Sequence, residues 1–335
     1  MKFKTIGIPK EIKSGEGRVG LRPEDVFYLK NKYIELNILV EQDAGNLSDF
    51  FINEYKASGA TIVGSANSLY MNSDLIIKVK EPMDKEVSFL QYPEKTFFCY
   101  FHFASTKLDS FKNGAAYASM LPYEELIDNN ELPLLSPMSE IAGKIGAHKG
   151  AELLMENGIL MGGASGVEPA NVLVIGGGVV GFNAAKLALG MGASVTILDK
   201  NISRIRELDI LLPASHNLYS TSNTLLNQIK KADLIIGAVH SVGKKTDCII
   251  NDHHFTQMKC KTVIVDVSID QGGCTSASTP TTHENPTYIH NGITMYCVSN
   301  MPGLTPKTST NALCNSTIKY VDYLIEHGNL NKFYK

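Results

Sequence analysis

Four side chains suited to anion binding and proton transfer follow apolar runs that are predicted to be strands. Arg18 follows the first of these runs, Lys80 and His102 follow two later ones, and Asp270 follows a run in the second half of the chain. In open parallel sheets, ligands bind outside the carboxyl ends of the strands. The pattern therefore predicts a guanidinium, an ammonium and an imidazole at the binding edge of one sheet, and a carboxylate at that edge of another. Such groups can bind a small carboxylate and exchange protons near neutral pH.

Each of these residues also has an ordinary structural explanation. A lysine at a strand end is usually solvated, and a lone histidine beside aromatic residues usually belongs to a core. A single arginine is usually a surface charge, and a single aspartate often caps a turn. Arg18 lies in a loop that Gly15, Gly17 and Gly20 are expected to make flexible. Only the four residues together point to a site.

A glycine pattern in the second half of the chain predicts a dinucleotide site. Gly176, Gly178 and Gly181 follow the apolar strand 172–175 and open a helix. The first glycine permits a tight turn, the second lets a pyrophosphate approach the backbone, and the third lets the helix pack on the strand. The next predicted strand ends at Asp199, where a carboxylate accepts hydrogen bonds from ribose hydroxyls and repels a 2′-phosphate. NAD is therefore expected rather than NADP, and an ordinary glycine turn in an α/β sheet is the alternative.

Short apolar runs alternate with helical patterns along most of the chain. Strands separated by helices indicate parallel sheets covered on both faces. We expect an α/β protein with two Rossmann-like doubly wound domains and an active-site cleft between them. Strands are expected at residues 5–8, 36–40, 75–79, 97–101, 115–120, 171–175, 194–198, 233–236 and 262–267. Helices are expected at residues 23–33, 85–90, 136–156, 179–191, 203–211 and 313–326.

The length of 335 residues predicts two domains. Residues 1–136 and 306–335 are expected to form a discontinuous substrate (catalytic) domain, because the last helix is predicted to return to it. Residues 137–305 are expected to form the NAD-binding Rossmann domain. The glycine-rich stretch 161–166 between the two halves is predicted to be a hinge or loop.

Composition excludes several classes of protein. The formal net charge of −3 lacks the basic excess of a nucleic-acid binder. Apolar residues make up 44% of the chain, which is enough for a sizeable core and excludes global disorder. No apolar run is long enough for a membrane span, and the N-terminus lacks a signal core, so a cytoplasmic protein is expected.

The cysteines and histidines do not predict a metal site. The six cysteines form no Cys-x-x-Cys pair and are expected to be buried free thiols in a reducing compartment. Cys248 and Cys260 flank His253 and His254, but their spacing matches no familiar zinc pattern. We therefore expect no metal.

Several blocks of sequence, in the same order, resemble the family of alanine dehydrogenases and the related nucleotide-binding subunit of proton-translocating transhydrogenases. The resemblance runs nearly end to end. The blocks Lys78-Val79-Lys80-Glu81-Pro82 and Ile269-Asp270-Gln271-Gly272-Gly273 are the most specific. The others are Gly7-Ile8-Pro9-Lys10-Glu11, Gly17-Arg18-Val19, Pro137-Met138-Ser139-Glu140, Val174-Ile175-Gly176-Gly177-Gly178, Pro280-Thr281-Thr282 and Ser299-Asn300-Met301-Pro302.

The resemblance implies an NAD-dependent, reversible oxidative deamination of L-alanine to pyruvate and ammonia. It implies that His102 and Asp270 are catalytic, with His102 bonding the substrate carbonyl and Asp270 activating water or ammonia. The substrate-binding residues would be Arg18, Lys80, Met138, Asn300 and Met301. The cofactor-binding residues would be Ser139, Gly176, Gly178, Val180, Gly181, Asp199, Arg204, Ser220, Val239, Ile269 and Asn300. It further implies a homo-oligomer, usually a hexamer in this family, although the family continues beyond the point where this chain ends.

Two other functions remain open at this point. One is an opine-type reductase, which joins a 2-oxo acid to another amino acid and needs a larger pocket. The other is a transhydrogenase-like nucleotide-binding module, although such relatives tend to lack a basic residue at Lys80. Two departures from the family also matter. Arg22 stands where a threonine would cap the helix starting at Pro23, which is expected to cost about 1 kcal/mol, and residues 239–243 replace a more apolar segment.

Overall fold

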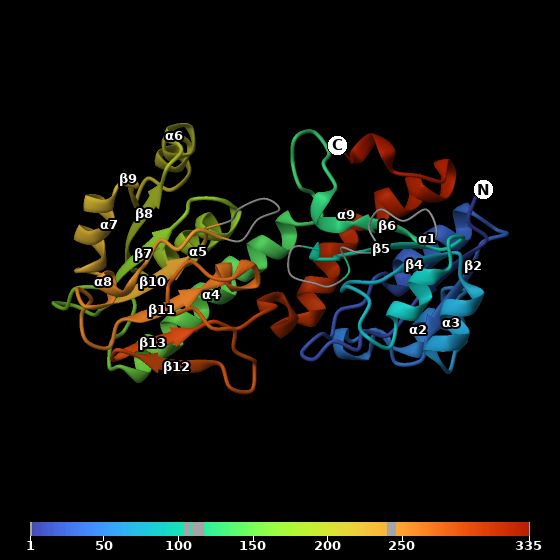
Figure 1. The fold of residues 1–335 in the computed structure, drawn as a ribbon, viewed down its shortest axis with the longest axis horizontal. Helices are drawn as coiled ribbons and strands as arrows, with labels where there is room; N and C mark the ends of the chain where they lie inside the picture. The colour runs from blue at the N-terminus through green and yellow to red at the C-terminus, as the bar shows by residue number, and fades with distance from the viewer. Residues whose placement is uncertain (1, 104–107, 109–116, 240–245, 335) are drawn as a thin grey trace. The chain divides into compact units, whose positions relative to one another are not determined.

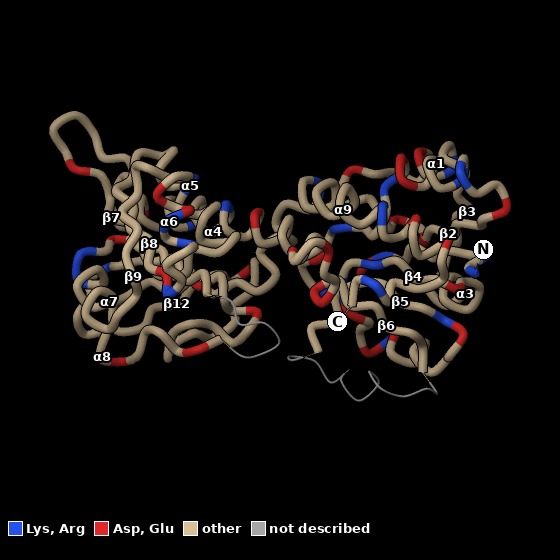
Figure 2. The backbone as a smooth tube through the Cα atoms, turned by 90° about the horizontal axis from the view of Figure 1, so that it is seen from above, with Lys and Arg blue, Asp and Glu red and all other residues tan. Residues whose placement is uncertain are grey.

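The computed structural model describes residues 2–103, 108, 117–239 and 246–334. The chain forms two compact units, one made of Met1–Met138 and Gly303–Lys335 and the other of Ser139–Pro302. The course of the chain in each unit can be followed in Figure 1. Positive and negative residues are interspersed along the described parts of both units (Figure 2).

The first unit is built on a parallel sheet with the strand order β3-β2-β1-β4-β5-β6. The order reverses direction between β1 and β4, which is the arrangement of a doubly wound fold. The strands are β1 (Thr5–Ile8), β2 (Asn37–Glu41), β3 (Thr61–Val63), β4 (Leu75–Ile77), β5 (Thr96–Cys99) and β6 (Ser119–Pro122). The helices are α1 (Pro23–Lys32), α2 (Ile52–Ala57), α3 (Ala66–Asn72) and α9 (Pro306–His327), with 3₁₀ turns η1 (Asn46–Ser48), η2 (Val87–Gln91), η5 (Tyr123–Glu125) and η8 (Asn331–Phe333). The 3₁₀ turn η7 (Met301–Leu304) begins in the second unit and ends in the first.

Aromatic packing on the first sheet brings α3 and η2 against the central strands. The ring of Tyr70 stacks on Phe89 and on Phe97, with centroids 4.5 and 6.0 Å apart. A Cβ atom at Gly7 would lie 2.7 Å from the Cδ2 atom of Leu69. The glycine in β1 therefore lets α3 approach the sheet more closely than any other residue would.

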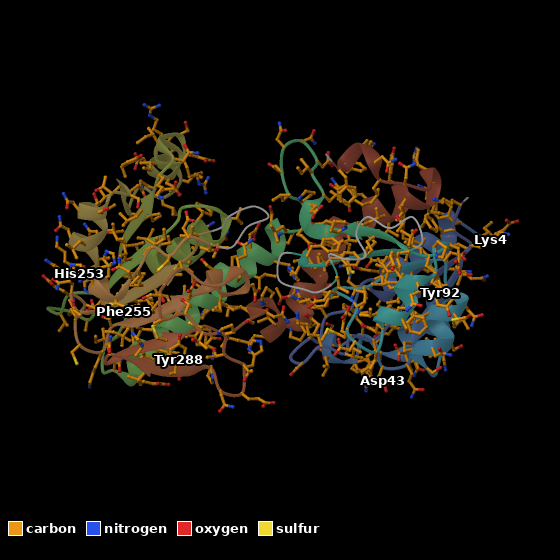
Figure 3. All side chains as sticks on the ribbon, in the orientation of Figure 1. Lys4, Asp43, Tyr92, His253, Phe255 and Tyr288 are labelled. Atoms are coloured by element: carbon orange, nitrogen blue, oxygen red, sulfur yellow. The ribbon has the colours of Figure 1, made fainter. Side chains whose placement is uncertain are left out.

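The second unit contains a sheet with the order β12-β13-β11-β10-β7-β8-β9, in which β12 is antiparallel. Its strands are β7 (Asn171–Ile175), β8 (Ser194–Asp199), β9 (His216–Tyr219), β10 (Leu234–Gly237), β11 (Val263–Asp266), β12 (Thr287–His290) and β13 (Ile293–Tyr296). Its helices are α5 (Val179–Gly190), α6 (Ile202–Leu211), α7 (Ser222–Ile229), α8 (Asp252–Phe255) and the 3₁₀ turn η6 (Val267–Gln271), while α4 (Ser136–Glu156) begins in the first unit. Phe255 lies in the apolar core and Tyr288 packs against that core (Figure 3).

The predicted α/β class with two Rossmann-like parts is confirmed, and several predicted elements match their observed bounds. The strands 5–8 and 171–175 and the helix 136–156 are confirmed. The helix predicted at 85–90 is wrong, because a 3₁₀ turn, η2, occupies this place. The strand predicted at 115–120 is β6 (Ser119–Pro122), and residues 115 and 116 lie outside the described residues.

Arg22 was expected to leave α1 without the side-chain cap of a threonine, and its side chain makes no cap hydrogen bond. Its own N–H, however, donates to the Asp25 carboxylate at 2.8 Å, and its guanidinium binds the same group from Nε at 2.9 Å. Asp25 thus performs half of a capping box and neutralises the arginine. The cysteines are free, but Cys248 and Cys260 are exposed rather than buried.

Candidate functional site

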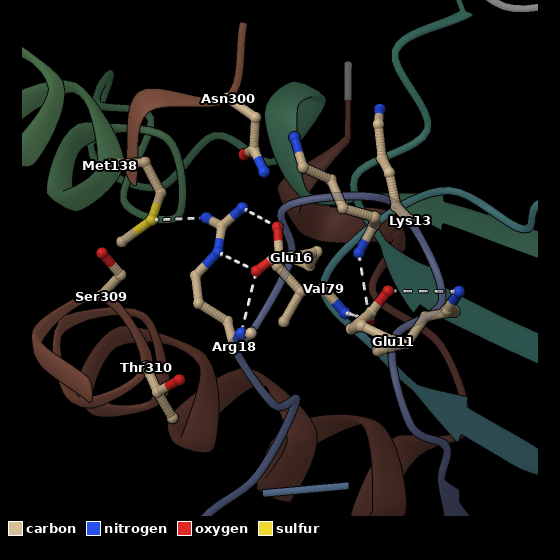
Figure 4. Close-up of polar contacts among 12 residues, drawn as sticks. Glu11, Lys13, Glu16, Arg18, Val79, Met138, Asn300, Ser309 and Thr310 are labelled. Atoms are coloured by element: carbon tan, nitrogen blue, oxygen red, sulfur yellow. Dashed lines mark hydrogen bonds and ion pairs between the residues drawn. The ribbon is translucent and has the colours of Figure 1, made fainter. Parts of the chain in front are cut away.

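Arg18 is a buried cation held by a buried carboxylate. It is 2% exposed, and its Nε donates to the Glu16 Oε1 atom at 2.7 Å while Nη2 donates to Oε2. Its Nη1 lies 3.0 Å from the Met138 sulfur (Figure 4). The ion pair lowers the pKa of Glu16 from 4.5 to about 2, against the opposing effect of burial. Glu16 therefore occupies the Nε–Nη2 edge of the guanidinium, and Met138 contacts the Nη1 end.

The loop around Arg18 is closely packed at Gly17 and Gly20, two of the three glycines that were expected to make it flexible. A Cβ atom at Gly20 would lie 2.5 Å from the carbonyl oxygen of Ile77, and one at Gly17 would lie 2.9 Å from the Cβ of Leu47. The N–H of Val19 donates to the Thr310 hydroxyl at 3.2 Å. The two glycines thus allow the loop to pack closely against β4 and the η1 segment, and this packing fixes the position of Arg18.

Lys80 and His102 lie together beyond the ends of β4 and β5. The Lys80 Nζ atom is 3.4 Å from the His102 Nε2 atom. The imidazole also stacks on the Tyr100 ring, with centroids 5.7 Å apart and planes within 9°. His102 has a φ of +51°, which is the left-handed region and is uncommon for a residue other than glycine. Such a conformation persists only where surrounding contacts hold it.

Lys78 has different contacts from Lys80. Its Nζ atom is buried between Glu86, at 2.9 Å, and Glu11, at 3.4 Å. A Glu11 carboxylate oxygen accepts hydrogen bonds from the backbone N–H of Val79 at 2.5 Å and of Lys80 at 3.2 Å. Burial raises the pKa of Glu11 to about 7, although Lys78 opposes the shift. This network fixes the backbone that carries Lys80.

The glycine turn of the second unit lies at the point where its strand order reverses, between β7 and β10. Gly176 has a φ of +98°, and a Cβ atom there would lie 2.6 Å from the Ala238 carbonyl oxygen. A Cβ atom at Gly181 would lie 1.8 Å from the Gly176 carbonyl oxygen, so the start of α5 touches the turn. Among the described residues, and apart from its own chain neighbours, nothing lies within 4 Å of a Cβ position at Gly178. The three glycines therefore form a tight turn with open space at its middle glycine, and their role in binding a cofactor stays a prediction.

Asp199 lies at the end of β8 beside this turn. One oxygen accepts the Gly177 N–H at 2.7 Å, and the other accepts the Asn201 N–H at 2.8 Å. Arg204 donates from Nε to the Gly177 carbonyl at 2.7 Å, and the N–H of Ser220 donates to the Asp199 carbonyl at 2.9 Å. A carboxylate has about four acceptor sites, so Asp199 keeps capacity for ribose hydroxyls. The residues present fit a dinucleotide.

Asp270 and Asn300 are brought together in the second unit. The backbone N–H of Asn300 lies 3.1 Å from one Asp270 oxygen and 3.4 Å from the other, and Asn300 has a φ of +57°. Asp270 is carried by η6, whose first residues are fixed by Asp266, which accepts the Ser268 N–H at 3.0 Å. The Ser268 hydroxyl in turn accepts the Val239 N–H at 3.0 Å. Asp270 is therefore held at the end of β11 by a defined backbone.

The remaining predicted residues lie on elements that border these groups. Ser139 and Val180 lie in the first turns of α4 and α5, and Ile269 and Met301 are buried. The predicted set thus divides between the two units. The sequence prediction missed the acids Glu11, Glu16 and Glu124, which hold the predicted cations or their backbone. Only the ion pair of Glu16 and Arg18 could have been suspected from the sequence, because the two residues are two positions apart.

Neither a group of metal ligands nor a membrane-spanning helix was expected from the sequence. Within residues 2–103, 117–239 and 246–334, no three His, Cys, Asp or Glu side chains are grouped to hold a metal ion. His253 and His254 lie in α8. None of the helices that the structure describes is both long and apolar enough to cross a membrane. Most of segment 239–243 lies outside the described residues.

Comparison with known proteins finds similarity to one family along residues 7–335. A family model described as "Alanine dehydrogenase/PNT, N-terminal domain" matches residues 7–142, and its C-terminal counterpart matches residues 142–335. "Alanine dehydrogenase" of Mycobacterium tuberculosis H37Rv is 42% identical, covering 96% of this chain and 88% of the relative. "Alanine dehydrogenase 2" of Staphylococcus aureus USA300 is 42% identical, with the same coverage.

Solved structures show a similar fold. A structure titled "L-alanine dehydrogenase" superposes with a TM-score of 0.90 at 39% identity, over 97% of this chain and 90% of the other. A transhydrogenase from Sinorhizobium meliloti superposes with a TM-score of 0.82 at 22% identity, covering 96% of this chain and 94% of that one. At that identity, the second likeness shows the fold alone.

Proposed function

This chain belongs to the alanine dehydrogenase/PNT family, and from that premise we infer that it catalyses the NAD-dependent, reversible oxidative deamination of L-alanine to pyruvate and ammonia. The chain is an amino-acid dehydrogenase whose relatives at 42% identity are named alanine dehydrogenase. The observation that carries the proposal is that the first unit holds both a buried arginine, Arg18, and the Lys80–His102 pair. These groups supply what a 2-oxo acid needs, which is positive charge for its carboxylate and a proton donor for its carbonyl or imine nitrogen.

The glycine turn and Asp199 would hold the cofactor. The N–H groups at the start of α5 and the open space at Gly178 suit a diphosphate. Asp199 would accept hydrogen bonds from ribose hydroxyls and repel a 2′-phosphate, which favours NAD over NADP. When bound, the nicotinamide exchanges a hydride with the α-carbon of the substrate.

Arg18 would bind the substrate carboxylate through Nη1, the guanidinium nitrogen that contacts the Met138 sulfur. Glu16 accepts hydrogen bonds from Nε and Nη2 and so fixes the plane of the guanidinium. A substrate carboxylate there would displace the weak contact to the sulfur. By the family resemblance, this thioether and Met301 would each border the substrate methyl group, which would favour substrates with small side chains.

Lys80 and His102 would act on the carbonyl oxygen. An ammonium only donates hydrogen bonds, so the contact to His102 Nε2 at 3.4 Å is made when that nitrogen carries a lone pair. Lys80 would bind the carbonyl oxygen, and His102 would exchange a proton with it as the carbinolamine forms and collapses. Asp270, held by the Asn300 N–H, would take the proton from attacking water or ammonia.

Steady-state kinetics test the proposal. Purified protein should oxidise NADH with pyruvate and ammonium and reduce NAD with L-alanine, faster than with serine, ornithine or glyoxylate, and faster with NADH than with NADPH. His102→Ala and Asp270→Asn should each abolish most turnover while NADH binding stays nearly unchanged. Absence of alanine-dependent NADH formation in the wild-type protein would overturn the proposal, and near-normal rates in either variant would overturn that residue's role.

Two alternatives are less favoured. An opine-type reductase has the same fold, but the relatives above are named for alanine. A transhydrogenase-like module is supported only by a likeness in fold at 22% identity, and it would bind NADH tightly without turning over any 2-oxo acid with ammonium. A homo-oligomer, a hexamer by family resemblance, and a cytoplasmic location are proposed from the sequence alone.

A further inference from the structure

The backbone of His102 is held by a carboxylate that no part of the proposed chemistry uses. Glu124 Oε1 accepts the His102 N–H at 2.5 Å and the Phe101 N–H at 3.1 Å, and Oε2 lies 3.2 Å from the Phe101 nitrogen. Glu124 belongs to η5, which directly follows β6. We propose that Glu124 is a positioning residue for the reaction, because its carboxylate holds the turn that brings the His102 imidazole to Lys80. This inference rests on the proposed function of His102.

The strand register explains why a side chain is needed at this point. β5 and β6 pair from Thr96↔Ser119 to Cys99↔Pro122, and their ladder ends there. The Tyr100 N–H donates to the Val79 carbonyl at 3.0 Å. The N–H groups of Phe101 and His102 lie beyond the end of the β6 ladder, and Phe101 is fully buried. A buried N–H without an acceptor is costly. Glu124 supplies the acceptor two residues beyond the last paired residue of β6.

The conformation of His102 depends on the same contact. Its φ of +51° turns the chain sharply after Phe101 and brings its Nε2 atom to 3.4 Å from the Lys80 Nζ atom. If the backbone returned to the extended region that non-glycine residues prefer, the side chain would leave that position. The Glu124 oxygen bonded to both N–H groups makes the turned conformation the favoured one.

A ring contact from the same turn supports this arrangement but cannot replace the carboxylate. The Tyr123 ring packs edge-on against Tyr100, with centroids 5.1 Å apart, and Tyr100 stacks on the imidazole. These contacts set the plane of the imidazole but do not bond its backbone. Burial raises the pKa of Glu124 to about 7, while the N–H groups of His102 and Phe101 oppose that shift and so favour the ionised form.

Hydrogen exchange and kinetics on the full-length protein test the proposal together. Glu124→Ala removes the acceptor, and Glu124→Gln keeps an amide oxygen at the position that receives both N–H groups. The amides of Phe101 and His102 should exchange at least about tenfold faster in Glu124→Ala than in the wild type, and within about threefold of it in Glu124→Gln. Glu125→Ala, which removes an exposed carboxylate from the same turn, should leave the exchange unchanged.

The kinetic arm separates positioning from a merely structural role. For reductive amination of pyruvate, Glu124→Ala should lower kcat at least about tenfold, while KM for NADH changes less than about twofold. Glu124→Gln should restore most of kcat. If Glu124→Ala does not fold, Glu124→Asp replaces it, because its carboxylate is one methylene short of the two N–H groups and should behave like the alanine variant.

The outcomes are distinguishable. Unchanged exchange in Glu124→Ala overturns the proposal, and so does faster exchange with wild-type kcat in a protein that His102→Ala inactivates. If the wild-type protein turns over no 2-oxo acid, the proposed function fails, and the exchange data alone decide whether Glu124 holds His102.

Discussion

Replacing Glu16 by glutamine removes the negative charge beside the buried Arg18 and keeps the shape of the side chain. The folded-state pKa of Glu16 is about 2, compared with 4.5 for an unpaired glutamate. The native protein therefore gains stability from the ionised form above pH 4.5 and loses it as the pH falls through 2. This shift in the pKa corresponds to a contribution of about 3 kcal/mol to the free energy of unfolding at neutral pH. Leaving one charge of a buried pair uncompensated costs about 3–5 kcal/mol, so two separate arguments agree.

Differential scanning calorimetry of the full-length protein at pH 7.5 measures this effect. A loss of about 3 kcal/mol should lower the unfolding transition of the first unit by about 6–12 °C. Glu24→Gln is the matched control, because Glu24 pairs with Arg22 at 2.6 Å but is mostly exposed, so that its transition should move by about 2 °C or less. The difference in transition temperature between the wild type and Glu16→Gln should become smaller as the pH is lowered from 4.5 towards 3. A drop no larger than that of the control, or a gap that does not shrink, would refute the reasoning.

Two further substitutions probe the framework of each unit. The pKa of Glu11 is raised from 4.5 to about 7, so the native state holds a proton that the unfolded chain has released, and stability declines as the pH rises through that window. In urea titrations, the free energy of unfolding of Glu11→Gln relative to that of the wild type should rise by up to about 3 kcal/mol between pH 5 and pH 8. A difference in stability that stays constant over this pH range would contradict the reasoning. Gly181→Ala places a Cβ 1.8 Å from the Gly176 carbonyl oxygen, so it should destabilise the second unit by at least about 2 kcal/mol and weaken NADH binding in calorimetry. Gly190→Ala in the same helix, where the space is open, should be neutral or stabilising, and equal effects of the two would argue against close packing at the turn.

The sequence predicted the candidate site because the rule that placed it is local. Parallel strands expose their carboxyl ends at one edge, so a polar residue after an apolar run falls there without knowledge of the pairing. Arg18, Lys80, His102 and Asp270 were all found by this rule. The acids that hold them were not. Glu124, for example, reaches His102 only because β6 pairs with β5 in one register, and no local pattern shows that register.

Several of the elements that were missed are short. The segment α2–β3–α3 contains helices of six and seven residues and a strand of three, which depend on packing against the sheet rather than on propensity. The hairpin of β12 and β13 could have been found. Asn291 and Gly292, with φ values of +50° and +77°, form its turn, and Asn-Gly between two apolar runs is a strong hairpin signal.

The buried charges of the first unit explain why the net charge of −3 is a poor guide to the site. A site for a small carboxylate needs cations, but a cation taken from water without a partner is too costly to keep. Arg18 and Lys78 each lie against a buried carboxylate, Glu16 and Glu86. Those pairs keep each cation in place at little net charge, and Glu16 also interacts electrostatically with Lys80. The acids that hold these cations are therefore as necessary to the geometry of the site as the cations that the sequence displays.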